Sequence, residues 1–107
     1  MLGELTPREL SERLARDPDG LVLLDVREPE EHEICTLAGA LHVPLGDLAR
    51  RASELDPERP TVVICHHGIR SAHAAAYLGS LDFDAVYNLS GGIDRWAQDV
   101  DPMMRRY

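Results

Sequence analysis

A cysteine at the end of an apolar run is the first candidate for chemistry in this sequence of 107 residues. Cys65 follows residues 61–64, a β-branched and apolar stretch that is typical of a buried strand. A short segment with a glycine and an arginine separates it from an alanine-rich run, 71–81, that has the pattern of a helix. The segment and its flanking residues are Cys65, His66, His67, Gly68, Ile69, Arg70 and Ser71.

This order of strand, loop and helix is suited to holding an anion beside the thiol. In open α/β sheets ligands bind at the carboxyl ends of the strands, which is where Cys65 would lie. The N–H groups of the loop and of the first helical turn would point inward, and the helix dipole favours the thiolate. Gly68 permits backbone angles that a side chain resists, and Arg70 can bind an anionic group through two hydrogen bonds. We therefore predict Cys65 as a nucleophile, residues 66–70 as an anion-binding loop and Ser71 as a supporting residue.

The alternative for Cys65 is a small buried hydrophobic residue, which is the commoner role of a cysteine at a strand end. The glycine, the arginine and the helix that follow at this spacing favour the chemical role. His66 and His67 suggest a general base or metal ligands, but the five histidines have no spacing that resembles a zinc site. We predict no metal site. Because adjacent side chains usually point apart, we expect these two imidazoles only to line the mouth of the site.

Short strand patterns alternate with helix patterns along the chain, which is typical of parallel βα units. Strands are predicted for residues 21–26, 40–43, 61–65 and 85–89. Helices are predicted between Thr6 and Asp17, over residues 45–55, over 71–81 and after Gly92. The expected fold class is α/β, with an open, mostly parallel sheet of about five strands, helices on both faces and one domain over residues 1–107.

Composition excludes several classes of protein. With 44% hydrophobic and 28% charged residues, the chain is typical of a globular domain rather than a disordered one. A formal net charge of -8 argues against a nucleic-acid-binding protein, and no apolar run reaches the roughly 20 residues that span a bilayer. Two cysteines are too few for a disulfide scaffold, so we expect a reducing, cytoplasmic setting. No coiled-coil pattern predicts an oligomeric state.

Four segments, in this order along the chain, together resemble the rhodanese family. They are Leu24-Asp25-Val26-Arg27-Glu28-Pro29-Glu30-Glu31, Gly39-Ala40-Leu41-His42-Val43-Pro44-Leu45, the loop from Cys65 to Ser71, and Leu89-Ser90-Gly91-Gly92-Ile93-Asp94-Arg95-Trp96. The resemblance covers nearly the whole chain and implies a sulfurtransferase with Cys65 as its catalytic cysteine.

The resemblance also implies a reaction and its partners. A small anionic sulfur donor such as thiosulfate would give its outer sulfur to the Cys65 thiolate, and a thiol or a small sulfur-carrier protein would accept it. No cofactor is implied, and His66 and His67 would influence the choice of acceptor. Independently of the resemblance, a parallel sheet would place Asp25 and Arg27 beside the loop, where we expect them to be supporting residues. Asp25 would bind either the loop amides or Arg70, or else it would cap the backbone at the end of its own strand.

Two other functions are compatible with the same residues. Cys-based phosphatases use a similar strand, loop and arginine, but their loop is longer than the four residues, His66 to Ile69, that stand between Cys65 and Arg70. The other alternative is a non-enzymatic binding module, although such modules typically lack the nucleophile.

Two further segments bear on the family resemblance. Residues 35–38, Cys-Thr-Leu-Ala, replace the Gly-His-Ile-Pro that is usual in the family. Cys35 is therefore either a substituted structural position or a thiol that resolves a persulfide on Cys65. The tail, residues 99–107, resembles the end of rhodanese-like domains fused to ubiquitin-activating-like adenylyltransferases, and this resemblance suggests a protein acceptor.

Overall fold

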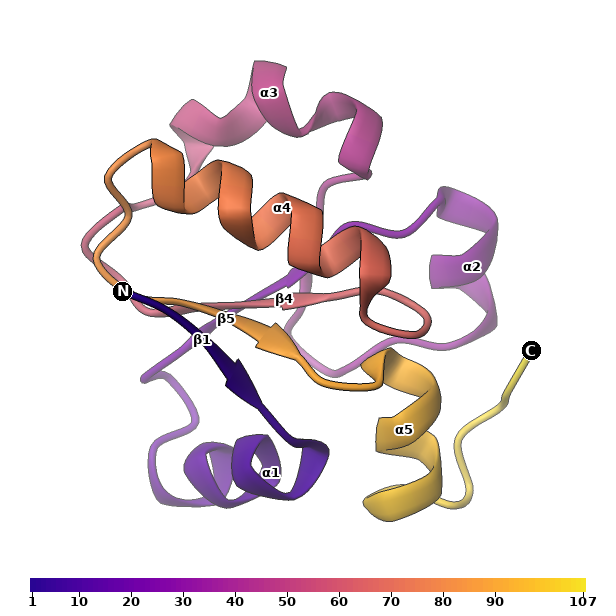
Figure 1. The fold of residues 1–107 in the computed structure, drawn as a ribbon. Coiled ribbons are helices and arrows are strands. Elements are labelled where there is room, and N and C mark those ends of the chain that lie inside the picture. Colours follow the sequence, from indigo (N-terminus) through magenta and orange to yellow (C-terminus); the bar gives the residue numbers. More distant parts are fainter.

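A parallel sheet forms the middle layer of the computed structural model, which describes residues 1–107 (Figure 1). The strands stand in the order β1-β5-β4-β2-β3, and every neighbouring pair is parallel. Their bounds are β1 Leu2–Leu5, β2 Val22–Asp25, β3 Leu41–His42, β4 Thr61–Ile64 and β5 Val86–Leu89. The predicted α/β class and open parallel sheet of five strands are confirmed.

Helices cover both faces of this sheet. Figure 1 shows α1 and α5 together on one face, with α3 and α4 on the other. The helices are α1 Pro7–Arg16, α2 Pro29–Ile34, α3 Leu48–Arg51, α4 Ile69–Ser80 and α5 Gly92–Asp99. No helix has both the length and the apolar character that crossing a membrane requires.

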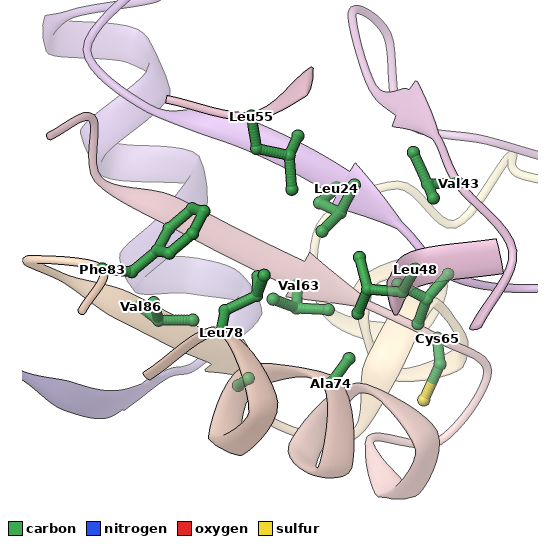
Figure 2. Packing of buried hydrophobic residues seen from close by; sticks show 12 residues of the cluster. Leu24, Val43, Leu48, Leu55, Val63, Cys65, Ala74, Leu78, Phe83 and Val86 are labelled. Atoms are coloured by element: carbon green, nitrogen blue, oxygen red, sulfur yellow. The ribbon is translucent and has the colours of Figure 1, made fainter. Parts of the chain in front are cut away.

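The central strand β4 is buried on both of its faces and separates two hydrophobic clusters. Because side chains alternate along a strand, Val63 and Cys65 join the cluster beneath α4, whereas Val62 and Ile64 join the one beneath α1 and α5. In Figure 2, Cys65 lies at one end of the first cluster and Phe83 at the other. The pleat of β4 thus turns the Cys65 side chain toward the helix that follows it.

The first helix begins directly after Thr6, as predicted, and its first turn is capped by side chains. The Thr6 hydroxyl accepts a hydrogen bond from the Glu9 N–H at 3.2 Å, and the Glu9 carboxylate accepts one from the Thr6 N–H at 2.9 Å. This reciprocal capping box satisfies two N–H groups that a helix otherwise leaves free. Helix α4 begins at Ile69, two residues before the predicted start.

Three parts of the chain differ from the expectation. The segment 45–55 is not one helix, because 3₁₀ turns at Leu45–Asp47 and Ala52–Glu54 flank a single α-helical turn. The N-terminal strand β1 was not predicted, since an edge strand of four residues leaves only a short pattern. Helix α2 was also not predicted, because it has six residues and none of them is buried, so no apolar periodicity marks it.

Candidate active site

The Cys65 thiol lies inside a loop that directs N–H groups at it. Its Sγ accepts hydrogen bonds from the Gly68 N–H at 3.1 Å and from the Ser71 N–H at 3.3 Å. The Ser71 hydroxyl lies 3.2 Å from the same sulfur. Only 1% of the residue is exposed, so these donors act where water does not compete for them. The arrangement can hold a negative charge on sulfur.

Glycines give the loop this shape. Gly68 precedes α4 with a φ of 101°, a left-handed conformation that residues with a side chain rarely adopt. On the other side, the carbonyl groups of Cys65 and His66 accept hydrogen bonds from the Ile93 and Asp94 N–H groups of α5, at 2.8 and 3.1 Å. This approach needs Gly92, because a Cβ atom there would lie 2.6 Å from the Cys65 carbonyl oxygen. The loop is therefore fixed from both sides by helix N-termini.

A buried amide side chain supports the same loop from β5. The Ser71 hydroxyl donates to Asn88 Oδ1, and Asn88 Nδ2 donates to the Gly68 carbonyl at 3.1 Å. Asn88 thus contacts both residues whose N–H groups point at Cys65. Sequence reasoning missed Asn88, although a polar residue inside the apolar run 85–89 was an available signal.

The loop arginine is paired with an acid from α2. Arg70 Nη1 and Nη2 donate to the two carboxylate oxygens of Glu31 at 2.6 and 2.8 Å. The hydrogen bonds from Arg70 lower the pKa of Glu31 to about 2, and the same pair raises the pKa of Arg70. Glu31 was not among the predicted site residues, because α2 contains three glutamates and nothing in the sequence shows which of them faces the loop.

Asp25 and Arg27 form a buried pair at the end of β2. Arg27 is fully buried and donates from Nε and Nη2 to the Asp25 carboxylate at 2.9 and 2.7 Å. Asp25 also accepts from the Arg27 backbone N–H at 3.0 Å and lies 3.1 Å from His32 Nδ1. Burial raises the pKa of Asp25, but its hydrogen bonds with Arg27 and His32 outweigh burial and hold that pKa below its usual value.

These contacts decide between the two roles considered for Asp25. Its carboxylate hydrogen-bonds Arg27 and His32, and it makes no hydrogen bond with Arg70 or with the amides of the loop. The expected direct support of the loop by Asp25 is therefore wrong, and the local alternative holds. The physical reason is that Arg27, two residues away, presents its whole guanidinium edge to this carboxylate.

The final residue of the sequence, Tyr107, packs against the loop. Its ring stacks on His66 with centroids 3.9 Å apart, and its hydroxyl accepts from Arg27 Nη1 at 3.0 Å and donates to Glu31 at 2.7 Å. Burial raises the pKa of Tyr107, which reaches about 12. Sequence reasoning noted the tail but did not place Tyr107 at the site.

The two loop histidines do not point apart as expected. Their rings meet edge to face with centroids 3.9 Å apart, because His66 is held against the Tyr107 ring. Burial, followed by the neighbouring His67, lowers the pKa of His66, so its imidazole is neutral at pH 7. Both histidines still line the opening of the site.

An open hollow of about 400 Å³ lies at the loop that surrounds Cys65. Its lining is Cys65, His66, His67, Ile69 and Arg70, which are five of the predicted site residues. Cys35 does not line this hollow, and its Sγ lies 3.8 Å from Arg27 Nη1. No group of three or more His, Cys, Asp or Glu side chains is arranged to hold a metal ion.

Comparison with known proteins finds one family along nearly all of the chain. Residues 6–99 match the family model described as the rhodanese-like domain. A sulfurtransferase of Allochromatium vinosum is 36% identical over 104 residues, which cover 97% of this chain and 96% of that protein. The thiosulfate sulfurtransferase GlpE of Pseudomonas entomophila is 36% identical over 83 residues, which cover 78% of this chain and 76% of that protein.

A plant protein and a solved structure extend the comparison. The rhodanese-like/PpiC domain-containing protein 12, chloroplastic, of Arabidopsis thaliana is 42% identical over 93 residues, or 83% of this chain. The chain spans only 31% of the length of that plant relative. The crystal structure of a rhodanese-related protein from Thermoplasma volcanium superposes with a TM-score of 0.81 at 30% identity, covering 91% of this chain and 92% of that one.

Proposed function

Because this chain belongs to the rhodanese-like domain family, we propose that it is a sulfurtransferase that carries sulfane sulfur as a persulfide on Cys65. One observation carries the proposal: the Cys65 sulfur accepts N–H groups of Gly68 and Ser71 inside a closed loop. The names of the relatives that match over most of their length, a sulfurtransferase and a thiosulfate sulfurtransferase, support this reaction class.

In the first half of the reaction, the Cys65 thiolate attacks the outer sulfur of thiosulfate. A bond forms between the Cys65 Sγ and that sulfur, the sulfur–sulfur bond of thiosulfate breaks, and sulfite leaves with its electron pair. The product is a Cys65 persulfide with its charge on the terminal sulfur. Covalent storage on an activated thiolate divides the transfer into two steps.

In the second half, a thiolate acceptor attacks the terminal sulfur of the persulfide. The bond between the two sulfurs of the persulfide breaks, and its electron pair returns to Cys65 as a thiolate. The N–H groups of the loop face the negative charge at the start and at the end of the cycle, so they need no rearrangement. The acceptor is a small thiol or a sulfur-carrier protein in a reducing, cytoplasmic setting.

Arg70 and the two histidines surround the entry of the donor. The Arg70 Nη groups are bound to Glu31, so the arginine steadies the loop and presents the rest of its guanidinium to the hollow. We assign it the orientation of the anionic donor. His66 and His67 line the same hollow, where they contact the acceptor.

Intact-protein mass spectrometry after incubation with thiosulfate tests the proposal. The reduced native protein should gain about 32 Da, the mass of one sulfur, and cyanide or dithiothreitol should remove it. Cys65→Ser should gain nothing. Cys35→Ser, the matched control at the other thiol, should gain the same mass as the native protein. A sulfur adduct that persists in Cys65→Ser, or no adduct on the folded and reduced native protein, would contradict the proposal.

A further inference from the structure

The Ser71 hydroxyl has two acceptors and a single hydrogen. Ser71 is fully buried at the start of α4, and Asn88 is 5% exposed on β5. The hydroxyl oxygen lies within hydrogen-bond distance of both Cys65 Sγ and Asn88 Oδ1. Because Ser71 is fully buried and has one hydroxyl hydrogen, the direction of that O–H bond decides which neighbour receives the hydrogen bond.

The orientation of the Asn88 amide determines that direction. Asn88 Nδ2 faces two acceptors, the Gly68 carbonyl at 3.1 Å and a Glu4 carboxylate oxygen at 3.5 Å. The nitrogen must therefore be on this side and the carbonyl oxygen on the side of Ser71. A carbonyl oxygen only accepts, so the hydroxyl of Ser71 donates to Asn88.

With its hydrogen directed at Asn88, the Ser71 oxygen turns lone pairs toward Cys65. This arrangement suits a Cys65 thiol, whose S–H donates to the Ser71 oxygen across 3.2 Å. It does not suit a thiolate, which has no hydrogen and is repelled by lone pairs. The N–H groups of Gly68 and Ser71 can donate to the sulfur in either form, whereas the Ser71 hydroxyl must turn toward Cys65 to donate to the thiolate.

We propose that the Ser71 hydroxyl is a rotor that donates to Asn88 while Cys65 is a thiol and turns to donate to Cys65 once Cys65 is a thiolate. On ionisation the Cys65 proton leaves to solvent, and the Ser71 proton stays on its own oxygen and only changes direction. Asn88 is therefore a positioning residue that competes with the thiolate for one hydrogen bond. In the persulfide the charge lies on the terminal sulfur, and the hydroxyl returns to Asn88.

The test is the pH midpoint of Cys65 ionisation, followed by thiolate ultraviolet absorbance against the matching Cys65→Ser protein. Ser71→Ala should raise the midpoint by about one pH unit, the size expected for one lost hydrogen bond. Asn88→Leu, which removes the competing acceptor at similar volume, should lower it by roughly half a unit to one unit. In the Ser71→Ala background, Asn88→Leu should leave the midpoint unchanged.

The double variant separates the rotor from a purely structural role of Asn88. If Asn88 only anchors the Gly68 carbonyl, Asn88→Leu will shift the midpoint equally with and without the Ser71 hydroxyl, and the proposal is overturned. An unchanged midpoint in Ser71→Ala would also overturn it. Should Asn88→Leu fail to fold, Asn88→Asp keeps the acceptor and should raise the midpoint more in the native background than in Ser71→Ala. An equal rise in both would count against the rotor.

This inference deepens the proposed function and rests on the same thiolate. The midpoint is measured without any sulfur donor, so its outcome is independent of whether thiosulfate loads Cys65. A protein that ionises as predicted but gains no sulfur would contradict the proposed function alone.

Discussion

Glu31 and Arg70 lie 39 residues apart in the chain and meet in a two-pronged ion pair at the mouth of the site. The pair joins α2 to the loop that surrounds Cys65. Because Arg70 lines the hollow, the pair also brings the Glu31 carboxylate near the place where we propose that the anionic donor binds. The arginine is thus held in position at the expense of some of its attraction for anions.

Removing that negative charge should strengthen the binding of thiosulfate. Glu31→Gln keeps an amide of similar shape near Arg70 but no longer neutralises the positive charge of the arginine. A single charge near a protein surface changes the binding free energy of an anion by on the order of 1 kcal/mol. We expect the KM for thiosulfate to fall roughly three- to tenfold, with a smaller change in kcat.

The matched control is Glu30→Gln, which removes an exposed acid from the same helix. It should change KM by less than twofold. The effect of Glu31→Gln should also shrink as salt is added, because salt screens charges near the surface. A rise in KM in Glu31→Gln at low salt would show that holding Arg70 matters more than the charge of Glu31.

The same ion pair predicts a loss of stability in acid. The pKa of Glu31 is about 2, below its ordinary value of 4.5, so the folded state binds this proton less readily than the unfolded state. The stabilisation is complete above pH 4.5 and is lost as the pH falls toward 2. Up to about 3 kcal/mol of the free energy of unfolding should disappear over this range.

Urea denaturation at a series of pH values measures this loss. Asp25, whose pKa is also lowered, contributes to the same acid limb in the native protein and in the variants. Glu31→Gln should therefore reduce, but not abolish, the fall in the free energy of unfolding at acid pH. Glu30→Gln should leave that fall unchanged. Native and Glu31→Gln curves that stay parallel between pH 5 and pH 2 would contradict the assignment.

The sequence predicts the loop around Cys65 well because its determinants are local. A buried strand, a glycine, an arginine and the start of a helix all stand within residues 61–71, and each acts on its immediate neighbours. The start of the first helix after Thr6 has equally local determinants, because the two hydrogen bonds between Thr6 and Glu9 span three residues. Local chemistry of this kind is visible without knowledge of the fold.

The partners that complete the site are distant in sequence, and no local pattern marks them. Glu31 is 39 residues from Arg70, Asn88 is 17 residues from Ser71, and Tyr107 is 76 residues from Glu31. Which acid of α2 faces the loop depends on how the helix packs, and its burial pattern shows no apolar face. Of these three partners, only Asn88 is marked in the sequence, as a polar residue within an otherwise apolar strand.

The hydroxyl of Tyr107 should contribute to stability through its two partners. Tyr107→Phe keeps the ring on His66 but leaves Arg27 Nη1 and Glu31 with one hydrogen bond fewer each. Hydrogen bonds to charged groups contribute about 1.5–3 kcal/mol when buried, and partial exposure reduces this, so we expect a loss of about 1–2 kcal/mol in the free energy of unfolding.

Tyr77→Phe is the control, because Tyr77 is 37% exposed and Tyr107 is 39% exposed, and the Tyr77 hydroxyl has no hydrogen-bond partner within the protein. It should change the free energy of unfolding by less than about 0.5 kcal/mol. Equal, small losses in both variants would mean that the tail contributes through ring stacking alone.

Among the glycines of the site, Gly92 should be the one whose replacement is most damaging. A methyl group there would overlap the His66 carbonyl oxygen, and its φ of 65° is left-handed. The atoms that an added Cβ would meet are the carbonyl groups of His66 and Cys65, and this backbone cannot move without moving the Cys65 side chain. We expect Gly92→Ala to lower the free energy of unfolding by about 3 kcal/mol or more, from strain and overpacking together. Whatever folds should load sulfur on Cys65 poorly.

Gly79→Ala adds the same methyl group as Gly92→Ala but should stabilise the protein. Gly79 lies in α4, with no atom within 4 Å of the position of an added Cβ. Alanine is the better helix former, so this variant should gain up to about 1 kcal/mol and load sulfur normally. Urea denaturation and mass spectrometry after thiosulfate treatment measure both effects on each variant. If Gly92→Ala were as stable and as readily loaded as Gly79→Ala, the close contact between α5 and the loop would not position Cys65.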